Sequence, residues 1–229
     1  MNEVNTIISK MHSLYSGRIS HLNVFYMFGL FKKKIPDANV LFKKFFSAWY
    51  PEDERPVMPR PDMYQIEAYK GEPLDLEKIQ YLKPGYLAEV KELVDITIPD
   101  AALNDFQHII KASSLDLNVL DAVDKFYDRA KISALINESD PKDFSNSYLV
   151  TVCEFGAMLG YLFNQLEGFG WLYSYPYFNS IIVHRKSGFA ITVFDWAVKK
   201  FSEYGVEDGF VAKFHAAIDG TNGKFEDEE

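Results

Sequence analysis

Four residues in the C-terminal half of the sequence carry side chains that could take part in a reaction. Cys153 offers a thiol, His184 an imidazole, and Glu154 and Asp195 each a carboxylate. A nucleophile, a base and an orienting carboxylate are the groups that covalent catalysis requires. Glu154, His184 and Asp195 would suffice for general acid–base hydrolysis if the fold brought them together. A hydrolase-like enzyme of unrecognised class using these three residues is therefore one hypothesis for the function.

Three of these residues also have an ordinary structural interpretation, which we prefer. Cys153 lies in the middle of a predicted helix beside apolar positions, where a small buried thiol is common. His184 ends a predicted strand before a turn, and Asp195 is placed to cap a helix beginning at Trp196. Because Cys153 is the only cysteine, neither an intrachain disulfide nor a cysteine-based zinc site can form.

The sequence lacks the motifs of the common nucleotide-dependent and zinc-dependent enzymes. It contains no phosphate loop, dinucleotide fingerprint, nucleophile elbow, His-Glu-x-x-His or EF-hand pattern. Its five histidines are scattered, with no pair at helical or hairpin spacing. We therefore expect no metal site, assign no cofactor and name no catalytic residue with assurance.

An aromatic run over residues 171–178 is the strongest indication of a binding surface. Tryptophan and tyrosine are enriched at interfaces because they bury area while keeping a polar tip. Pro176 cannot donate to a ladder, so the predicted strand lies at an edge or is broken there. Packing of one strand face onto the preceding helix is the alternative interpretation. The candidate binding residues are Trp171, Tyr173, Tyr175 and Tyr177.

The element before this run is the clearest helix in the sequence. From about Ser147 to Leu166, apolar residues recur at alternating spacings of four and three, which predicts a helix with a narrow apolar seam. Gly156 and Gly160 lie beside that seam. Glycine costs about 1 kcal/mol in a helix interior, so we expect another segment to pack closely against them.

The periodicity elsewhere predicts an α+β fold. It combines a mostly helical N-terminal part with a helix–strand–hairpin–helix module containing a small antiparallel sheet. The hairpin is predicted over residues 180–194 around a turn at 185–188. The remaining predicted helices span 38–49, capped by Asp37, then 74–81, 86–94, about 103–110, 119–130, and a last one capped by Asp208.

Prolines and charge indicate how the chain is organised. Four of the ten prolines lie between Pro51 and Pro61, and proline disrupts regular structure. We predict a basic, aromatic helical segment at 1–50, a linker or loop at 51–62, a main α+β domain at 63–224 and an acidic disordered tail at 225–229.

The charge distribution favours one class of partner. The net charge is −9, with +5 on residues 1–49 and −14 on the remainder. An acidic body disfavours nucleic-acid binding and would attract a basic protein partner. The longest apolar run, 24–31, is far shorter than the about 20 residues of a membrane span, and the N-terminus lacks a secretory signal. We expect a cytoplasmic protein without a membrane span.

Residues 120–218 resemble a bacterial domain family of unknown function. The resemblance is carried by a Gly-Ala-x-Leu-Gly-type helix stretch at 156–160, a tryptophan strand, a Tyr-Pro-Tyr loop, a hairpin and the Val-Phe-x-Trp-Ala-x-Lys segment at 193–199. It implies a shared fold and provides no catalytic residue.

Two functions of different classes follow from the sequence. The first, which we prefer, is a non-catalytic interaction protein, for example an immunity-like or regulatory partner binder. The acidic body, the aromatic strand and the lack of a recognisable catalytic constellation favour it. The second is the hydrolase-like enzyme that uses Glu154, His184 and Asp195.

Overall fold

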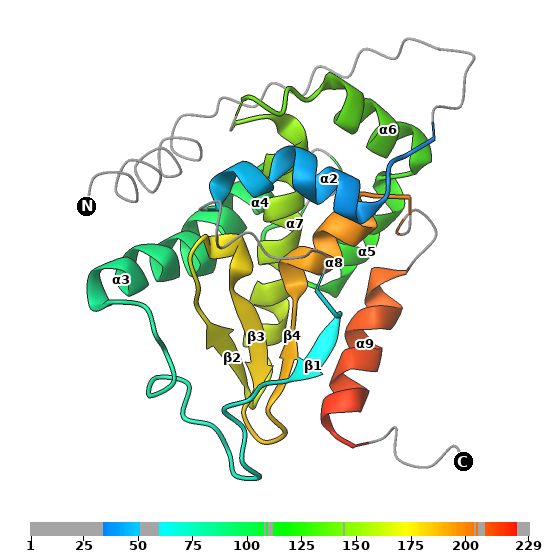
Figure 1. Cartoon of the computed structure of the whole chain (residues 1–229). Helices are drawn as coiled ribbons and strands as arrows, with labels where there is room; N and C mark the ends of the chain where they lie inside the picture. Colours follow the sequence, from blue (N-terminus) through cyan, green and yellow to red (C-terminus); the bar gives the residue numbers. More distant parts are fainter. Residues whose placement is uncertain are drawn as a thin grey trace.

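The α+β architecture predicted from the sequence is confirmed by the computed structural model shown in Figure 1. The structure describes residues 34–50, 60–107, 109, 112–143, 145–203, 205 and 209–223. One long helix, α7, runs through the middle of the molecule, with a sheet on one side and shorter helices around the rest.

The sheet has four antiparallel strands in the order β1-β4-β3-β2. The three C-terminal strands are consecutive, whereas β1 comes from the distant segment that follows the proline-rich stretch and pairs with β4. In the register, Tyr64 lies opposite Ala190, Val183 opposite Ala190, and Gly170 opposite Val183. The strands are β1 (Met63–Gln65), β2 (Phe169–Leu172), β3 (Ile181–His184) and β4 (Phe189–Ile191).

The predicted hairpin is confirmed, but the strand before it is shorter than expected. Strands β3 and β4 meet at a turn in which Gly188 has φ +69°, a conformation that glycine adopts readily. Strand β2 ends at Leu172, before Pro176, and lies at the edge of the described sheet, which is one of the two alternatives predicted for it. Beyond that point the backbone amide of Ser174 bonds to the hydroxyl of Ser180 at 2.9 Å, and a 3₁₀ turn, η4 (Tyr177–Asn179), follows.

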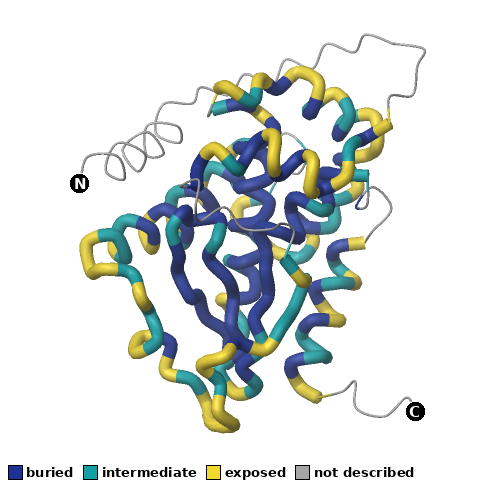
Figure 2. Tube along the Cα trace, in the orientation of Figure 1, coloured by how far each residue is buried: buried dark blue, intermediate teal, exposed yellow. Residues whose placement is uncertain are grey.

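Helix α7 (Ser147–Asn164) has the predicted extent, but it is buried on all sides rather than along one seam. Even Thr151 and Glu154 are buried. The reason is that α4, α5, α6, α8 and two strands all pack against it. Figure 2 shows most of α7 and of strands β2, β3 and β4 in the dark blue of buried residues, at the centre of the molecule.

The two glycines of α7 lie where neighbouring segments come closest, as predicted. A Cβ at Gly156 would lie 2.5 Å from Cδ1 and 3.0 Å from the Cα of Phe194, in the first turn of α8 (Val193–Lys200). A Cβ at Gly160 would overlap the indole of Trp171 on β2. The two glycines thus allow α8 and strand β2 to pack close to the axis of α7.

The segment before the proline-rich stretch belongs to the same core. The Asp37 side chain caps α2 (Ala38–Phe45) by accepting from the amide of Val40 at 3.0 Å, as predicted. The helix gives way to a 3₁₀ turn, η1 (Ser47–Trp49), earlier than expected. The Phe45 ring packs 4.5 Å from that of Tyr148 on α7. Residues 34–50 therefore share the main hydrophobic core with the rest of the described chain.

Two helix predictions are wrong in the middle of the chain. Residues 74–81 form turns: Asp75 accepts from the amides of Lys78 and Ile79 within the segment, while Gln80 at its end bonds to β2. The single helix predicted at 119–130 is two helices, α5 (Leu117–Phe126) and α6 (Arg129–Glu138). The break occurs because Asp128 accepts from the amide of Lys131 and starts a new helix there.

A continuous helical run precedes this pair. It consists of α3 (Pro84–Glu92), a π-helical segment η3 (Leu93–Thr97) and α4 (Ile98–Phe106). Pro84 occupies the first turn of α3, where its missing amide proton costs nothing. The last helix, α9, spans Phe210–Thr221. The predicted cap at Asp208 and the tail at 225–229 lie outside the described residues, as do residues 1–33 and 51–59. Within the described chain, no helix has the length and apolar character needed to cross a membrane.

Replacing Gly160 with alanine tests the close approach at α7. We expect Gly160→Ala to lower the free energy of unfolding by about 1–3 kcal/mol, because the methyl group would displace the Trp171 indole. Urea denaturation measures the change. Gly85→Ala is the matched control, since nothing lies within 4 Å of a Cβ there. At this exposed helical position alanine should stabilise by about 0.4–1 kcal/mol. A raised midpoint for Gly160→Ala would contradict the packing.

Candidate functional site

The thiol of Cys153 is in an inert environment. Its side chain is fully buried in α7. Burial raises the pKa of the thiol to about 12, and a hydrogen bond with Tyr177 only partly opposes this. The thiol is therefore protonated at neutral pH, which suits a packing role rather than nucleophilic attack.

Glu154, His184 and Asp195 lie in three different surroundings. Glu154 is buried on α7, where its charge contributes to the raised pKa of Tyr127. His184 ends β3 at the hairpin turn, and its Nδ1 lies 2.8 Å from the hydroxyl of Ser187. Asp195 lies on α8 beyond the opposite end of β3, near Asn179. A strand of four residues spans about 10 Å, so His184 and Asp195 share no site.

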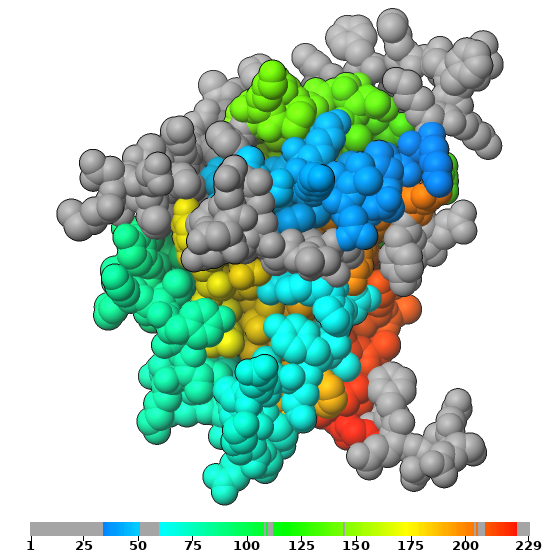
Figure 3. Space-filling view, viewed as in Figure 1, coloured from blue at the N-terminus to red at the C-terminus, as the bar shows by residue number. Residues whose placement is uncertain are grey.

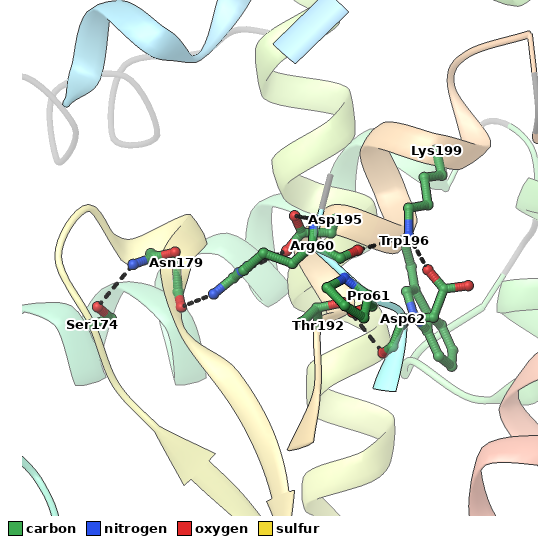
Figure 4. Close-up of polar contacts among 9 residues, drawn as sticks. All are labelled: Arg60, Pro61, Asp62, Ser174, Asn179, Thr192, Asp195, Trp196 and Lys199. Carbon is green, nitrogen blue, oxygen red and sulfur yellow. Dashed lines mark hydrogen bonds and ion pairs between the residues drawn. The ribbon is translucent and has the colours of Figure 1, made fainter. Parts of the chain in front are cut away.

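Asp195 has a different role from the helix cap predicted for it. Helix α8 begins at Val193, with Thr192 as its N-cap, so Asp195 falls inside the first turn. There a carboxylate interacts favourably with the helix dipole. It accepts three hydrogen bonds from Arg60: from the backbone amide at 3.0 Å, Nε at 2.9 Å and a terminal guanidinium nitrogen at 2.7 Å. Figure 4 shows this bidentate arrangement.

The Arg60–Asp195 pair is almost removed from water. The Asp195 side chain is 1% exposed and that of Arg60 18%. Burial raises the pKa of Asp195, while the charge and hydrogen bonds of Arg60 oppose the rise. Burial lowers the pKa of Arg60, but Asp195 more than offsets this and the pKa lies above its ordinary value. Each charge thus depends on the other.

The residues that follow Arg60 attach the same segment to α8. The backbone oxygen of Asp62 accepts from the indole nitrogen of Trp196 at 2.9 Å. Lys199 donates to the backbone oxygen of Arg60 at 2.8 Å and to the Asp62 carboxylate. We call Arg60, Asp62, Asp195 and Lys199 the α8 clamp. The sequence assigned Arg60 and Asp62 to a linker, and no local signal there indicates partners more than a hundred residues away.

A second polar cluster lies along the edge of β2. The side-chain amide of Gln80 donates to the backbone oxygen of Trp171 and accepts from the backbone amide of Tyr173, both at 3.1 Å. The Tyr173 hydroxyl donates to Oδ2 of Asp95 at 2.7 Å. Asp95 lies in the π-helical segment η3, a type of helical turn that is frequent at functional sites.

Buried oxygen atoms in this cluster and on α3 lack hydrogen-bond partners within the described chain. Among the described residues, none bonds to Oδ1 of Asp95, Oε2 of Glu89 or the hydroxyl of Tyr175. Tyr86 contributes to the raised pKa of Tyr175 and lies three residues before Glu89, on the same face of α3. Burial raises the pKa of Asp95, although the bond from Tyr173 opposes this. We define the β2-edge site as Gln80, Tyr173 and Asp95, which the hydrogen bonds above connect through β2, together with Tyr175 two residues after Tyr173 and Glu89 on α3.

The structure separates the four aromatic residues proposed as a binding strand. Trp171 and Tyr177 are buried among apolar side chains, which is the packing alternative considered from the sequence. Tyr173 is also buried, but its hydroxyl reaches Asp95, and Tyr175 is half-buried. Tyr173 and Tyr175 thus belong to the β2-edge site. No signal in the sequence indicated Gln80, which lies in a segment of turns, or Glu89 and Asp95, which lie in the helical run.

Comparisons with protein-family models, curated proteins and solved structures returned no match to this chain. The resemblance of residues 120–218 to a bacterial domain family therefore stays a prediction. Within the described chain, no three His, Cys, Asp or Glu residues converge as a metal site would require.

The α8 clamp can be tested through stability. We expect Asp195→Asn to lower the free energy of unfolding by about 3 kcal/mol, because Arg60 would remain charged and largely buried without its counter-ion. Chemical denaturation measures the loss. Replacing both partners, as in Arg60→Met with Asp195→Leu, should recover most of it. Asp121→Asn, which breaks an exposed pair with Lys125, is the control and should change stability by no more than about 0.5 kcal/mol. Equal effects of the two aspartate substitutions would refute the clamp.

His184 predicts a pH dependence of stability. Burial lowers its pKa, with a contribution from Lys186, so the folded protein holds the imidazole neutral. The unfolded chain therefore binds the proton first, near pH 6.5. Stability should fall as the pH decreases below about 6.5. His184→Gln should show a smaller decrease between pH 7 and 5 in thermal or urea unfolding. Curves of identical slope for the two proteins would show that His184 makes no contribution.

Proposed function

We propose that this protein is a non-catalytic interaction protein that binds a basic segment of a partner protein at the β2-edge site. The observation that carries the proposal is the set of buried acceptor oxygens on Asp95 and Glu89 that lack donors among the described residues. A buried acceptor without a partner costs about 1–3 kcal/mol. A lysine or arginine from a partner would supply the missing donors and a compensating charge.

The surface around the site supports a basic partner. Residues 84–106 contain five acidic residues and one lysine, a net charge of −4. Glu92 and Asp100 are exposed along this helical run. Ile96 lies between them and is 57% exposed. A negative surface attracts a basic partner and accelerates its approach, and an exposed aliphatic side chain provides an apolar contact at its centre.

The hydrolase alternative receives less support. Its three residues lie in separate surroundings, and the carboxylate of Asp195 is occupied by Arg60. General acid–base catalysis requires groups within hydrogen-bond reach of one substrate. The interaction hypothesis uses Asp95, which is bonded to Tyr173, and Glu89 on α3; each has a buried oxygen without a donor among the described residues.

Neutralising the site tests the proposal. Glu89→Gln with Asp95→Asn should abolish salt-sensitive capture of a basic protein from host extract, because the attraction and the charged acceptors are both lost. Affinity capture followed by mass spectrometry compares it with the wild type. The control is Glu138→Gln with Asp140→Asn, which changes the same charge at exposed positions around the end of α6 and should leave capture unchanged. Equal capture by both double variants would rule out this site.

A further inference from the structure

We propose that the partner binds to β2 as an added strand, parallel to β2, in the place that the Gln80 side chain occupies in the free protein. This inference rests on the proposed function and specifies how the partner is recognised. The occupant is an extended peptide segment with basic side chains. Strand addition to a sheet edge is a general mode of peptide recognition, in which backbone hydrogen bonds supply affinity and side-chain pockets supply specificity.

The bonding pattern of Gln80 carries the inference. One amide group, that of the Gln80 side chain, donates to the oxygen of Trp171 and accepts from the amide of Tyr173. In a parallel sheet, one residue of a neighbouring strand makes this same pair of bonds to two residues that flank its partner. The Gln80 side-chain amide thus takes the place of the backbone N–H and C=O of one residue of a parallel strand, opposite Leu172.

The position of β2 makes the exchange possible. It is the last strand on its side of the described sheet. A sheet edge presents backbone donors and acceptors that another chain can use, and proteins cover such edges when they are not in use. Here the edge is covered by the side chain of Gln80 rather than by a strand. The backbone N–H and C=O of a peptide can therefore replace both hydrogen bonds that Gln80 makes to β2.

The segment that carries Gln80 can release β2 without leaving the protein. We call residues 66–83 the strap; it forms turns and bends without helix or strand. Leu76 is buried against the outer face of the sheet, and the amide of Leu74 bonds to the oxygen of Arg185 at 2.9 Å. In Figure 3 the strap and α3 flank the yellow surface of β2 and β3. Withdrawing Gln80 therefore breaks two hydrogen bonds and leaves the apolar anchor in place.

The surroundings of the edge determine which strand fits. Tyr173 links the edge to Asp95 through its hydroxyl, so a peptide on this edge lies beside η3 and its acidic helical run. Successive side chains of a strand point to opposite sides, so every second residue of the peptide would face the acidic helical run at 84–106. The matching sequence alternates lysine or arginine with β-branched residues.

The test uses a defined probe, an acetylated and amidated hexapeptide of alternating lysine and valine. Isothermal titration calorimetry measures its Kd. Gln80→Ala should bind the peptide about tenfold more tightly than the wild type, because two competing hydrogen bonds are gone. Gln65→Ala is the control. The Gln65 amide bonds to the oxygen of Ser187 at the other side of the sheet, and its removal should leave the Kd unchanged.

A second peptide separates strand addition from charge attraction. Methylating alternate backbone nitrogens removes the donors that face the edge while keeping every lysine, and should weaken binding at least tenfold. Hydrogen exchange of the Tyr173 amide gives an independent readout. Its exchange should accelerate in Gln80→Ala and slow again when the unmethylated peptide is added.

Several results would overturn the inference. Equal binding of the two peptides, or no effect of Gln80→Ala, would mean that strand addition is wrong while acidic recognition stands. Absence of binding to both wild type and Gln80→Ala would also overturn it, as would a peptide-independent dimer of Gln80→Ala in size-exclusion chromatography, which would assign the edge to a second copy. Undiminished capture of a basic partner by the Glu89→Gln, Asp95→Asn variant would instead show that the proposed function fails at this site.

Discussion

Helix α7 is enclosed along almost its whole length, and the other layers of the structure are arranged to cover it. A helix that is apolar on every side cannot face water anywhere, so it needs neighbours in all directions. The sheet, α4, α5, α6 and α8 supply them. Two of these contacts are closer than ordinary side chains would allow, which is why Gly156 and Gly160 interrupt an otherwise large-residue helix.

Helix α8 must lie at a defined distance from the axis of α7, and polar contacts hold it there. Gly156 admits Phe194 to the axis of α7, which places the next residue, Asp195, in a nearly dry environment. A buried carboxylate must be paired, and Arg60 from outside the C-terminal module provides the pair. The same segment continues into β1, so the clamp also determines where the fourth strand joins the sheet.

The opposite edge of the sheet is built differently. One edge strand is β1, a short strand whose preceding residues the α8 clamp attaches to α8. The other edge strand is β2, and there the side-chain amide of Gln80 bonds to the outer backbone groups. Three buried oxygens without donors among the described residues, on Asp95, Glu89 and Tyr175, belong to the β2-edge site. Each buried acceptor without a donor lowers the stability of the folded protein. Folding stability therefore does not account for these atoms. These oxygens and the edge of β2 are the features from which we propose a binding function.

The sequence by itself determined the elements whose signals are local. The apolar spacing gave the extent of α7, Asp37 the start of α2, and the turn at Gly188 the hairpin. The glycines in α7 also indicated a close approach, because their cost had to be compensated by packing. In each case the decisive residues lie within a few positions of one another.

Only the tertiary structure decided the partners. Arg60 and Asp195 are 135 residues apart, and Gln80 lies 91 residues before Trp171, so no periodicity or capping rule connects them. Hydrogen bonds also overrode the local pattern: Leu74 and Gln80 bond to distant residues. Ser174 bonds to Ser180, six residues further along the chain, instead of extending β2. A side chain's bonding capacity is visible in the sequence. Which group satisfies it depends on what the folded chain brings within about 3 Å.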